Sequence, residues 1–235
     1  MTAVPPRTFV AVFDLDGTLV DSVGDITAAA NKVLTAEGLG ALDIGQVRPL
    51  IGLPAVEIFR HAGMADHAET AIAPFRAALA DIIGQHSTVF PGVRNVLDHL
   101  ASTDWQLAVA TNKPTWLAQL ALTRAHLDHY FRRVQGAEEL AHKPDPATVV
   151  ACLNALGCHQ GVMIGDTTFD ILAGARAGLA TVALLSGSHT RDHIMSTGPD
   201  AIYTDMTDLH DSIGALERLA SHTRPHHQTP TWALT

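Results

Sequence analysis

Positive charge, cysteine and long apolar runs are all scarce in this sequence. Its 235 residues hold 15 Lys and Arg against 24 Asp and Glu, so a basic surface for nucleic acid or an anionic membrane is not expected. Apolar runs are interrupted by charges, Pro or Gly before they reach the length of a membrane span. The opening residues, MTAVPPRTFVAVFD, show no secretory pattern, and we therefore expect a cytoplasmic protein with no nucleic-acid or membrane partner.

Cysteine is limited to Cys152 and Cys158, which we expect to be reduced and buried rather than bridged or metal-bound. Histidine is plentiful but scattered, apart from a group near the end. That group belongs to HTRPHHQTPTWALT, residues 222–235, which has no periodicity and two prolines. We expect this tail to be flexible and solvated.

Six apolar runs of strand length alternate with helix-like segments along the chain. Apolar runs without alternation are typical of strands covered by helices on both faces. The expected fold class is therefore α/β, with a doubly wound parallel sheet. The six predicted strands are Val10–Asp14, Gln106–Thr111, Arg132–Ala137, Gly161–Asp166, Thr181–Leu185 and Asp200–Thr204.

One interval, residues 21–88, contains no convincing strand. Three stretches in it, residues 22–40, 54–64 and 67–86, have the apolar spacing of amphipathic helices. We expect a small helical domain inserted between the first strand and the helix that begins near Pro91. The predicted organisation is a core of residues 1–20 and 89–221, the helical insertion at 21–88 and the tail at 222–235.

Polar residues follow the predicted strands at their carboxyl ends, where doubly wound sheets bind ligands. Asp14, Asp16 and Gly17 follow the first strand, and Thr111 ends the second. Singly, each has an ordinary structural explanation, such as a turn or a helix N-cap. Further such residues follow the third and fourth strands. If every one of these residues had only a structural role, several coincidences would be needed to place them all at one edge of the sheet, so we interpret them as a functional site. Those further residues are Lys143, Asp166 and Asp170.

These residues fall in four short motifs whose order and spacing resemble the haloacid dehalogenase superfamily of phosphohydrolases. The motifs are DLDGT at 14–18, TNK at 111–113, Lys143 in HKPDP, and GDTTFD at 165–170. The helical insertion directly after the first motif is similar to the cap of the phosphoglycolate phosphatase and β-phosphoglucomutase branch. The resemblance covers nearly the whole chain except its tail.

The resemblance implies a magnesium-dependent phosphatase that passes through an aspartyl-phosphate. Asp14 would be the nucleophile, and Asp16 the general acid and then the base. Asp14 and Asp166 suit a hard cation with oxygen ligands, which in cytosol means Mg²⁺, and the resemblance adds the Asp16 backbone carbonyl as a ligand.

The remaining motif residues would support this chemistry. Thr111 and the Asn112 backbone would bind phosphoryl oxygens, while Lys143 would balance charge at the phosphate. Asp170 would orient the lysine or the waters on the metal, and Gly17 would permit the tight backbone after the nucleophile. The formal charge of the four acids, one lysine and the metal is negative, so one carboxyl should take up a proton readily, and Asp16 is the expected one.

The exact reaction stays open between several members of this family. The acid at Asp16 argues against a dehalogenase, and Lys32 is poorly placed for a Schiff base of the phosphonate-cleaving kind. TNKP at 111–114 favours the phosphoglycolate phosphatase type, with Arg48 as a candidate ligand for a substrate anion. A β-phosphoglucomutase-like phosphotransferase, or a pyrophosphatase or nucleotidase, are the alternatives.

A signalling module of the response-regulator receiver type is the alternative from another class. Such domains also place acids, a Thr and a Lys on a parallel sheet, but they are about half this length and lack an inserted helical domain. We therefore expect the partner to be a small-molecule phosphate ester, acted on by a monomer or homodimer.

Overall fold

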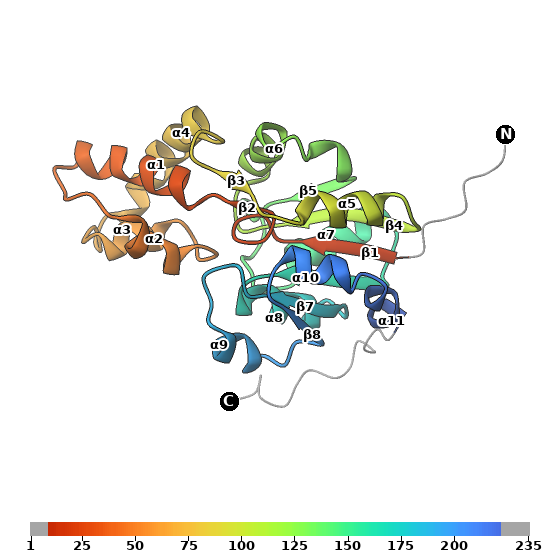
Figure 1. Ribbon diagram of the computed structural model, residues 1–235. Helices are drawn as coiled ribbons and strands as arrows, with labels where there is room; N and C mark the ends of the chain where they lie inside the picture. Colours follow the sequence, from red (N-terminus) through yellow and green to blue (C-terminus); the bar gives the residue numbers. More distant parts are fainter. Residues whose placement is uncertain (1–8, 222–235) are drawn as a thin grey trace.

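Residues 9–221 are described in the computed structural model shown in Figure 1. Six parallel strands form one sheet in the order β5-β4-β1-β6-β7-β8. This confirms the predicted α/β class, and each strand lies within two residues of its expected bounds. The strands are β1 Phe9–Phe13, β4 Trp105–Ala110, β5 Arg133–Gln135, β6 Gly161–Gly165, β7 Ala180–Leu184 and β8 Ala201–Tyr203. The predicted flexible tail, 222–235, lies outside the described residues.

Strand β1 forms the centre of the sheet and pairs in parallel with β4 on one side and β6 on the other. Its side chains alternate between the two faces, as the pleat requires. Ala11 and Phe13 enter the larger apolar core, whereas Val10 and Val12 enter a second core on the opposite face. Both faces are covered, which explains why the strand reads as one continuous apolar run.

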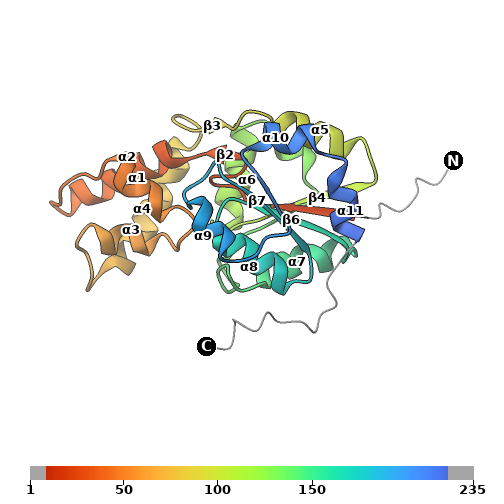
Figure 2. The ribbon, with the colours of Figure 1, turned by 60° about the horizontal axis from the view of Figure 1, so that its bottom comes forward.

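Helices form a layer on each face of this sheet. Figure 2 shows α7 and α8 below the sheet and α5 and α10 above it. Contacts of α7 with β4 and β5, and of α8 with β6 and β7, close the lower face, while α5 contacts β4 and α11 contacts β6. The helices of the core are α5 Val93–Ala101, α6 Thr115–Arg124, α7 Ala147–Leu156, α8 Thr168–Arg176, α9 Arg191–Met195, α10 Met206–Asp211 and α11 Ala215–Ser221, with a 3-10 turn η3 at Asp128–Tyr130.

The chain leaves the sheet through β2, Val20–Asp21, and returns through β3, Thr88–Val89, and these two strands pair in antiparallel. Between them lies the inserted helical segment, which Figures 1 and 2 both show beside one end of the sheet. Its elements are α1 Val23–Ala36, α2 Ile44–Val47, η1 Arg48–Leu50, α3 Val56–His61, η2 Ala68–Ala71 and α4 Ile72–Ile82. The three predicted helices correspond to α1, α3 and α4, whereas the two-residue strands were not expected.

The inserted segment has an apolar interior of its own. Helix α1 packs along α4, and the rings of Phe59 and Phe75 meet edge to face with their centroids 5.6 Å apart. Phe59 is fully buried, and burial of such a side chain contributes about 1.5–3 kcal/mol to stability. The packing of the amphipathic faces against each other therefore stabilises helices that would be marginal alone.

Two further expectations can be compared with the described residues. Cys152 and Cys158 are both buried, as predicted, and no disulfide joins them. Within residues 9–221, every helix is too short or too polar to cross a bilayer.

Candidate active site

The predicted polar residues meet at the carboxyl edge of the sheet, where three strands end side by side. Asp14 follows β1, Thr111 follows β4 and Asp166 follows β6. Backbone hydrogen bonds continue the strand pairing to this edge, since the Asp14 N–H donates to the Ile164 carbonyl at 2.9 Å. These residues lie on the neighbouring strands on either side of β1, where the strand order reverses, which is the usual ligand site of such folds.

Lys143 is the centre of the cluster and is only 5% exposed. Its ammonium donates to Asp14 Oδ1 at 2.7 Å, to Asp170 Oδ1 at 2.5 Å and to the Ala110 carbonyl at 2.9 Å. All three of its protons therefore have acceptors. Burial alone would lower the pKa of Lys143, but the Asp14 and Asp170 carboxylates outweigh burial and raise it, so the lysine is a fixed positive charge.

Three buried acids gather around this lysine. One carboxylate oxygen from each of Asp14, Asp166 and Asp170 lies within 4.8 Å of the others. Burial raises the pKa of Asp14 to about 7, even though Lys143 acts against the rise. Burial also raises the pKa of Asp166 well above its ordinary range, with Asp170 and Asp14 adding to the effect. The cluster thus holds more negative charge than Lys143 alone can balance.

This donor set fits a hard divalent cation. Carboxylate oxygens are the ligands that Mg²⁺ prefers, and a cation would offset both the burial and the mutual repulsion that raise the pKa of Asp14 and Asp166. Asp166 is oriented by the Thr18 hydroxyl, which donates to its Oδ1 at 2.7 Å. Asp170 is held by the backbone N–H of Thr167 at 3.0 Å and by the Thr167 hydroxyl at 2.6 Å. Asp170 therefore orients Lys143 while itself being held in place.

Two glycines allow the backbone to approach Asp166 closely. Gly17 has φ +93°, and a Cβ there would lie 2.4 Å from Asp166 Oδ2. A Cβ on Gly187 would lie 1.7 Å from the same oxygen. Gly17 belongs to the predicted site, whereas Gly187 was not identified, because it lies in the loop after β7, outside the four motifs.

Asp16 has different partners from Asp14. Its Oδ1 accepts from the Lys113 ammonium at 2.6 Å and from the Ser22 hydroxyl at 2.5 Å. Lys113 is 9% exposed, so both members of this ion pair are largely withdrawn from water. Sequence reasoning included Lys113 in its motif but gave it no role. Its place two residues after Thr111 at a strand end was the available signal.

Thr111 and Asn112 lie beside this pair. The Thr111 hydroxyl accepts from the Lys113 backbone N–H at 3.2 Å. The Asn112 side chain donates to the Gly52 carbonyl of the inserted segment at 2.8 Å and accepts from the Lys143 backbone N–H at 2.8 Å. Asn112 thus joins the inserted segment to the loop that carries Lys143.

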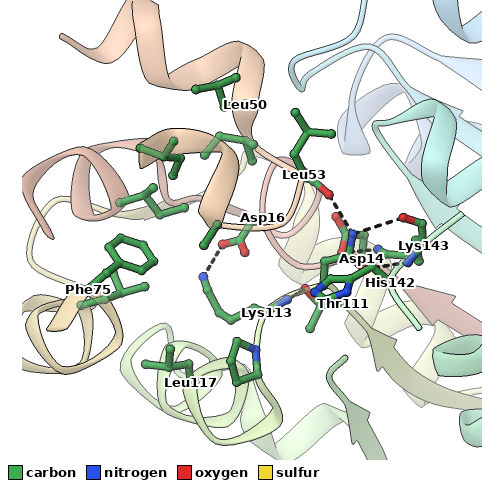
Figure 3. Close-up of a pocket in the computed structure, with 18 of the residues that line it drawn as sticks. Asp14, Asp16, Leu50, Leu53, Phe75, Thr111, Lys113, Leu117, His142 and Lys143 are labelled. Carbon is green, nitrogen blue, oxygen red and sulfur yellow. Dashed lines mark hydrogen bonds and ion pairs between the residues drawn. The ribbon is translucent and has the colours of Figure 1, made fainter. Parts of the chain in front are cut away.

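A cavity lies over Asp14 and Asp16, between the inserted segment and the core. Figure 3 shows Phe75 and Leu117 on one side of the Lys113–Asp16 pair, with Asp14 and Lys143 on the other. The cavity is therefore polar at the sheet edge and apolar beneath the inserted helices.

Two basic residues of the inserted segment lie differently with respect to this cavity. Arg48 is absent from its described lining and instead approaches Asp21 at 3.5 Å on the partly exposed surface. Arg76, which sequence reasoning did not single out, lines it from α4, and so does His142 from the core. Burial lowers the pKa of His142, and the charge of Arg76 lowers it further.

Comparison with known proteins gives a consistent result. Residues 11–184 match the family model of the haloacid dehalogenase-like hydrolases. Phosphoglycolate phosphatase of Rhodospirillum rubrum is 34% identical over 217 residues, which cover 86% of this chain and 90% of that protein. Phosphoglycolate phosphatase 1 of Pseudomonas aeruginosa is 34% identical over 212 residues, which cover 84% of this chain and 77% of that protein.

A solved structure gives the same fold. The crystal structure of a predicted phosphoglycolate phosphatase from Haemophilus somnus superposes with a TM-score of 0.76 at 29% identity. The superposition covers 89% of this chain and all of that one.

Proposed function

The chain belongs to the haloacid dehalogenase-like hydrolases and is a phosphoglycolate phosphatase-like phosphatase; on this basis we propose that it hydrolyses a small phosphate monoester through a covalent phosphate on Asp14. The observation that carries the proposal is Lys143, held between Asp14 and Asp170 with Asp166 close by. An isolated carboxylate and a phosphate dianion about 3.5 Å apart repel by roughly 9 kcal/mol at an effective dielectric of about 20. The fixed charge of Lys143 offsets part of this repulsion.

In the first step, a carboxylate oxygen of Asp14 forms a bond to phosphorus while the ester P–O bond breaks. The leaving alkoxide oxygen takes the proton of the Asp16 carboxyl. In the second step, Asp16 takes a proton from water, the water oxygen bonds to phosphorus, and the bond to Asp14 breaks to release inorganic phosphate. The pairing of Asp16 with Lys113 and Ser22 fixes the carboxyl at a distinct place from Asp14, which suits a division of labour between the two.

Asp14, Asp166 and the Asp16 backbone carbonyl are the residues that we propose to hold Mg²⁺. When bound, Mg²⁺ would supply positive charge to the phosphoryl oxygens. Asp170 completes the acid cluster, and its bonds to Lys143 and Thr167 favour an orienting role. Thr111 and the Asn112 backbone are proposed to donate hydrogen bonds to the phosphoryl group.

The inserted segment, residues 21–88, is proposed to act as a cap that closes over the substrate. Its loop at 50–54 already touches the core, where Asn112 donates to the Gly52 carbonyl. The alternatives are a β-phosphoglucomutase-like phosphotransferase and a pyrophosphatase or nucleotidase. A receiver-like module is set aside, because the family of the chain is a family of hydrolases. A cytoplasmic location and a monomeric or homodimeric state belong to the same proposal; two buried cysteines that form no disulfide are consistent with a reducing compartment.

The experiment is a screen of metabolite phosphates with Mg²⁺, comparing kcat/KM for phosphate release. We expect multiple turnovers that stop when EDTA is added, with phosphoglycolate as the first candidate substrate. Isomerisation of β-glucose 1-phosphate without net phosphate release would favour the mutase. The matched variant is Asp14→Asn, which should fold normally and release no phosphate; substantial activity in this variant would sink the covalent mechanism.

A further inference from the structure

We infer that Arg76 selects the substrate by binding an anionic group, a carboxylate, on the alcohol half of the phosphate ester. The inference rests on the proposed phosphatase function and assigns the specificity of the same cavity. Arg76 lies on α4, and its side chain lines the cavity that also contains Asp14 and Asp16. Arg76 and the two aspartates therefore line one cavity between the inserted segment and the core.

Arg76 differs from the rest of the surface that the inserted segment presents to this cavity. Among the described residues, every other side chain that residues 21–88 contribute to the lining is apolar, or is glycine. Ile58, Phe75 and Leu79 are examples, and all three are buried. The only charge with which the proposed cap can recognise a substrate is thus the guanidinium of Arg76.

The guanidinium of Arg76 is also unengaged. No hydrogen bond or ion pair joins it to another residue within 9–221, whereas Arg60 on the same segment pairs with Glu57 and Glu69. Glu138, an acid whose pKa responds to the Arg76 charge, already accepts from the Thr115 backbone N–H at 2.8 Å. A guanidinium carries five donors in a planar fork, and one on a cavity-lining residue with no ion pair of its own suits a bidentate anion.

The surroundings define the class of anion. The apolar side chains of the inserted segment offer no partners for the hydroxyls of a sugar, and burying hydroxyls against them without hydrogen bonds is unfavourable. The same side chains lower the local dielectric and strengthen an attraction between Arg76 and a carboxylate. A short ester with phosphate at one end and carboxylate at the other would place its phosphate at Asp14 and Lys143 and its carboxylate at Arg76. Phosphoglycolate has this form.

The test compares Arg76→Met with wild type on two substrates, phosphoglycolate and isobutyl phosphate. In the second compound an isopropyl group replaces the carboxylate with similar bulk and no charge. We expect Arg76→Met to raise KM for phosphoglycolate about 10- to 100-fold, the value of a charged hydrogen bond, with a small effect on kcat. Turnover of isobutyl phosphate by Arg76→Met should equal that by wild type. The KM of Arg76→Lys for phosphoglycolate should lie between the values of wild type and Arg76→Met.

The matched control is Arg60→Met, an arginine of the same segment whose partners are surface acids. It should leave both substrates unaffected. The inference is overturned if Arg76→Met changes both substrates equally, or if wild type does not prefer phosphoglycolate over isobutyl phosphate. It is also overturned if Arg48→Met, and not Arg76→Met, causes the selective loss. Failure of the underlying function is a separate result, in which wild type releases no phosphate from any ester.

Discussion

Replacing Lys143 with methionine should destabilise the metal-free protein strongly, and more at high pH than at low pH. The side chain of Lys143 is 3% exposed, and those of its partners Asp14 and Asp170 are 4% and 0% exposed. Methionine has a similar length but no charge, so both ion pairs and the bond to the Ala110 carbonyl are lost together.

The magnitude follows from the burial of the partners. Removing one member of a buried ion pair costs about 3–5 kcal/mol, because the remaining charge is left without compensation. For a protein of this size, about 1 kcal/mol corresponds to roughly 2–4 °C in Tm. We therefore expect Tm in EDTA at about pH 8 to fall by roughly 6–20 °C.

The dependence on pH has a definite sign. Burial raises the pKa of Asp14 to about 7 and that of Asp166 well above its ordinary range, so the folded protein binds protons that the unfolded chain has released. Their contribution to stability is therefore present at low pH and is lost as pH rises through the raised values. Without Lys143 this loss should be larger, so the difference between variant and wild type should shrink at about pH 5.5.

The assay is thermal unfolding followed by circular dichroism in EDTA at the two pH values. Lys32→Met is the control, because Lys32 is an exposed lysine on α1. It should melt within about 1 °C of wild type. A Tm for Lys143→Met equal to that of wild type at about pH 8 would refute the reasoning that the lysine compensates buried negative charge.

Three further predictions concern the acids and their supporting backbone. Asp16→Asn should slow the phosphorylation of Asp14 by alkyl phosphates about 100- to 10,000-fold, measured as the single-turnover rate of alcohol release. The same step should slow much less with p-nitrophenyl phosphate, whose leaving group needs no proton, and equal losses in this step would contradict the general-acid role. Gly17→Ala should lower Tm and weaken Mg²⁺ binding measured by calorimetry. The reason is that Gly17 has φ +93° and the alanine methyl group would lie 2.4 Å from Asp166 Oδ2. Unchanged Mg²⁺ binding would count against this packing. Mg²⁺ should raise Tm more at about pH 8 than at about pH 5.5, because protons compete for Asp14 and Asp166; an equal rise would argue against these ligands.

The sheet and its acid cluster could be predicted because they depend on simple rules. Strands buried on both faces read as continuous apolar runs, and Val10–Asp14 and Gly161–Asp166 have this form. Parallel strands bring their carboxyl ends to one edge, so residues far apart in sequence, such as Asp14 and Lys143, were expected to meet. The two-residue strands β2 and β3 are too short to leave any periodicity in the sequence.

The contacts of the inserted segment could not be predicted in the same way. Amphipathic spacing identifies a helix and its apolar face, but does not determine how the helix is docked on another domain. Sequence reasoning therefore named Arg48 as the candidate anion ligand and passed over Arg76, although of the two only Arg76 lines the cavity in the described structure. The pairing of Lys113 with Asp16 depends on side-chain geometry across two loops, which local sequence does not encode.

The most direct test of the account is chemical trapping of the phosphate on Asp14. The enzyme is mixed with substrate and Mg²⁺, quenched in acid during turnover and reduced with borohydride, which converts an aspartyl-phosphate to homoserine. Peptide mass spectrometry should find homoserine at position 14 in the wild type and none in an unreacted sample or in Asp14→Asn. Steady phosphate release with Asp14 unmodified under these conditions, or with homoserine at a different aspartate, would contradict the proposed mechanism.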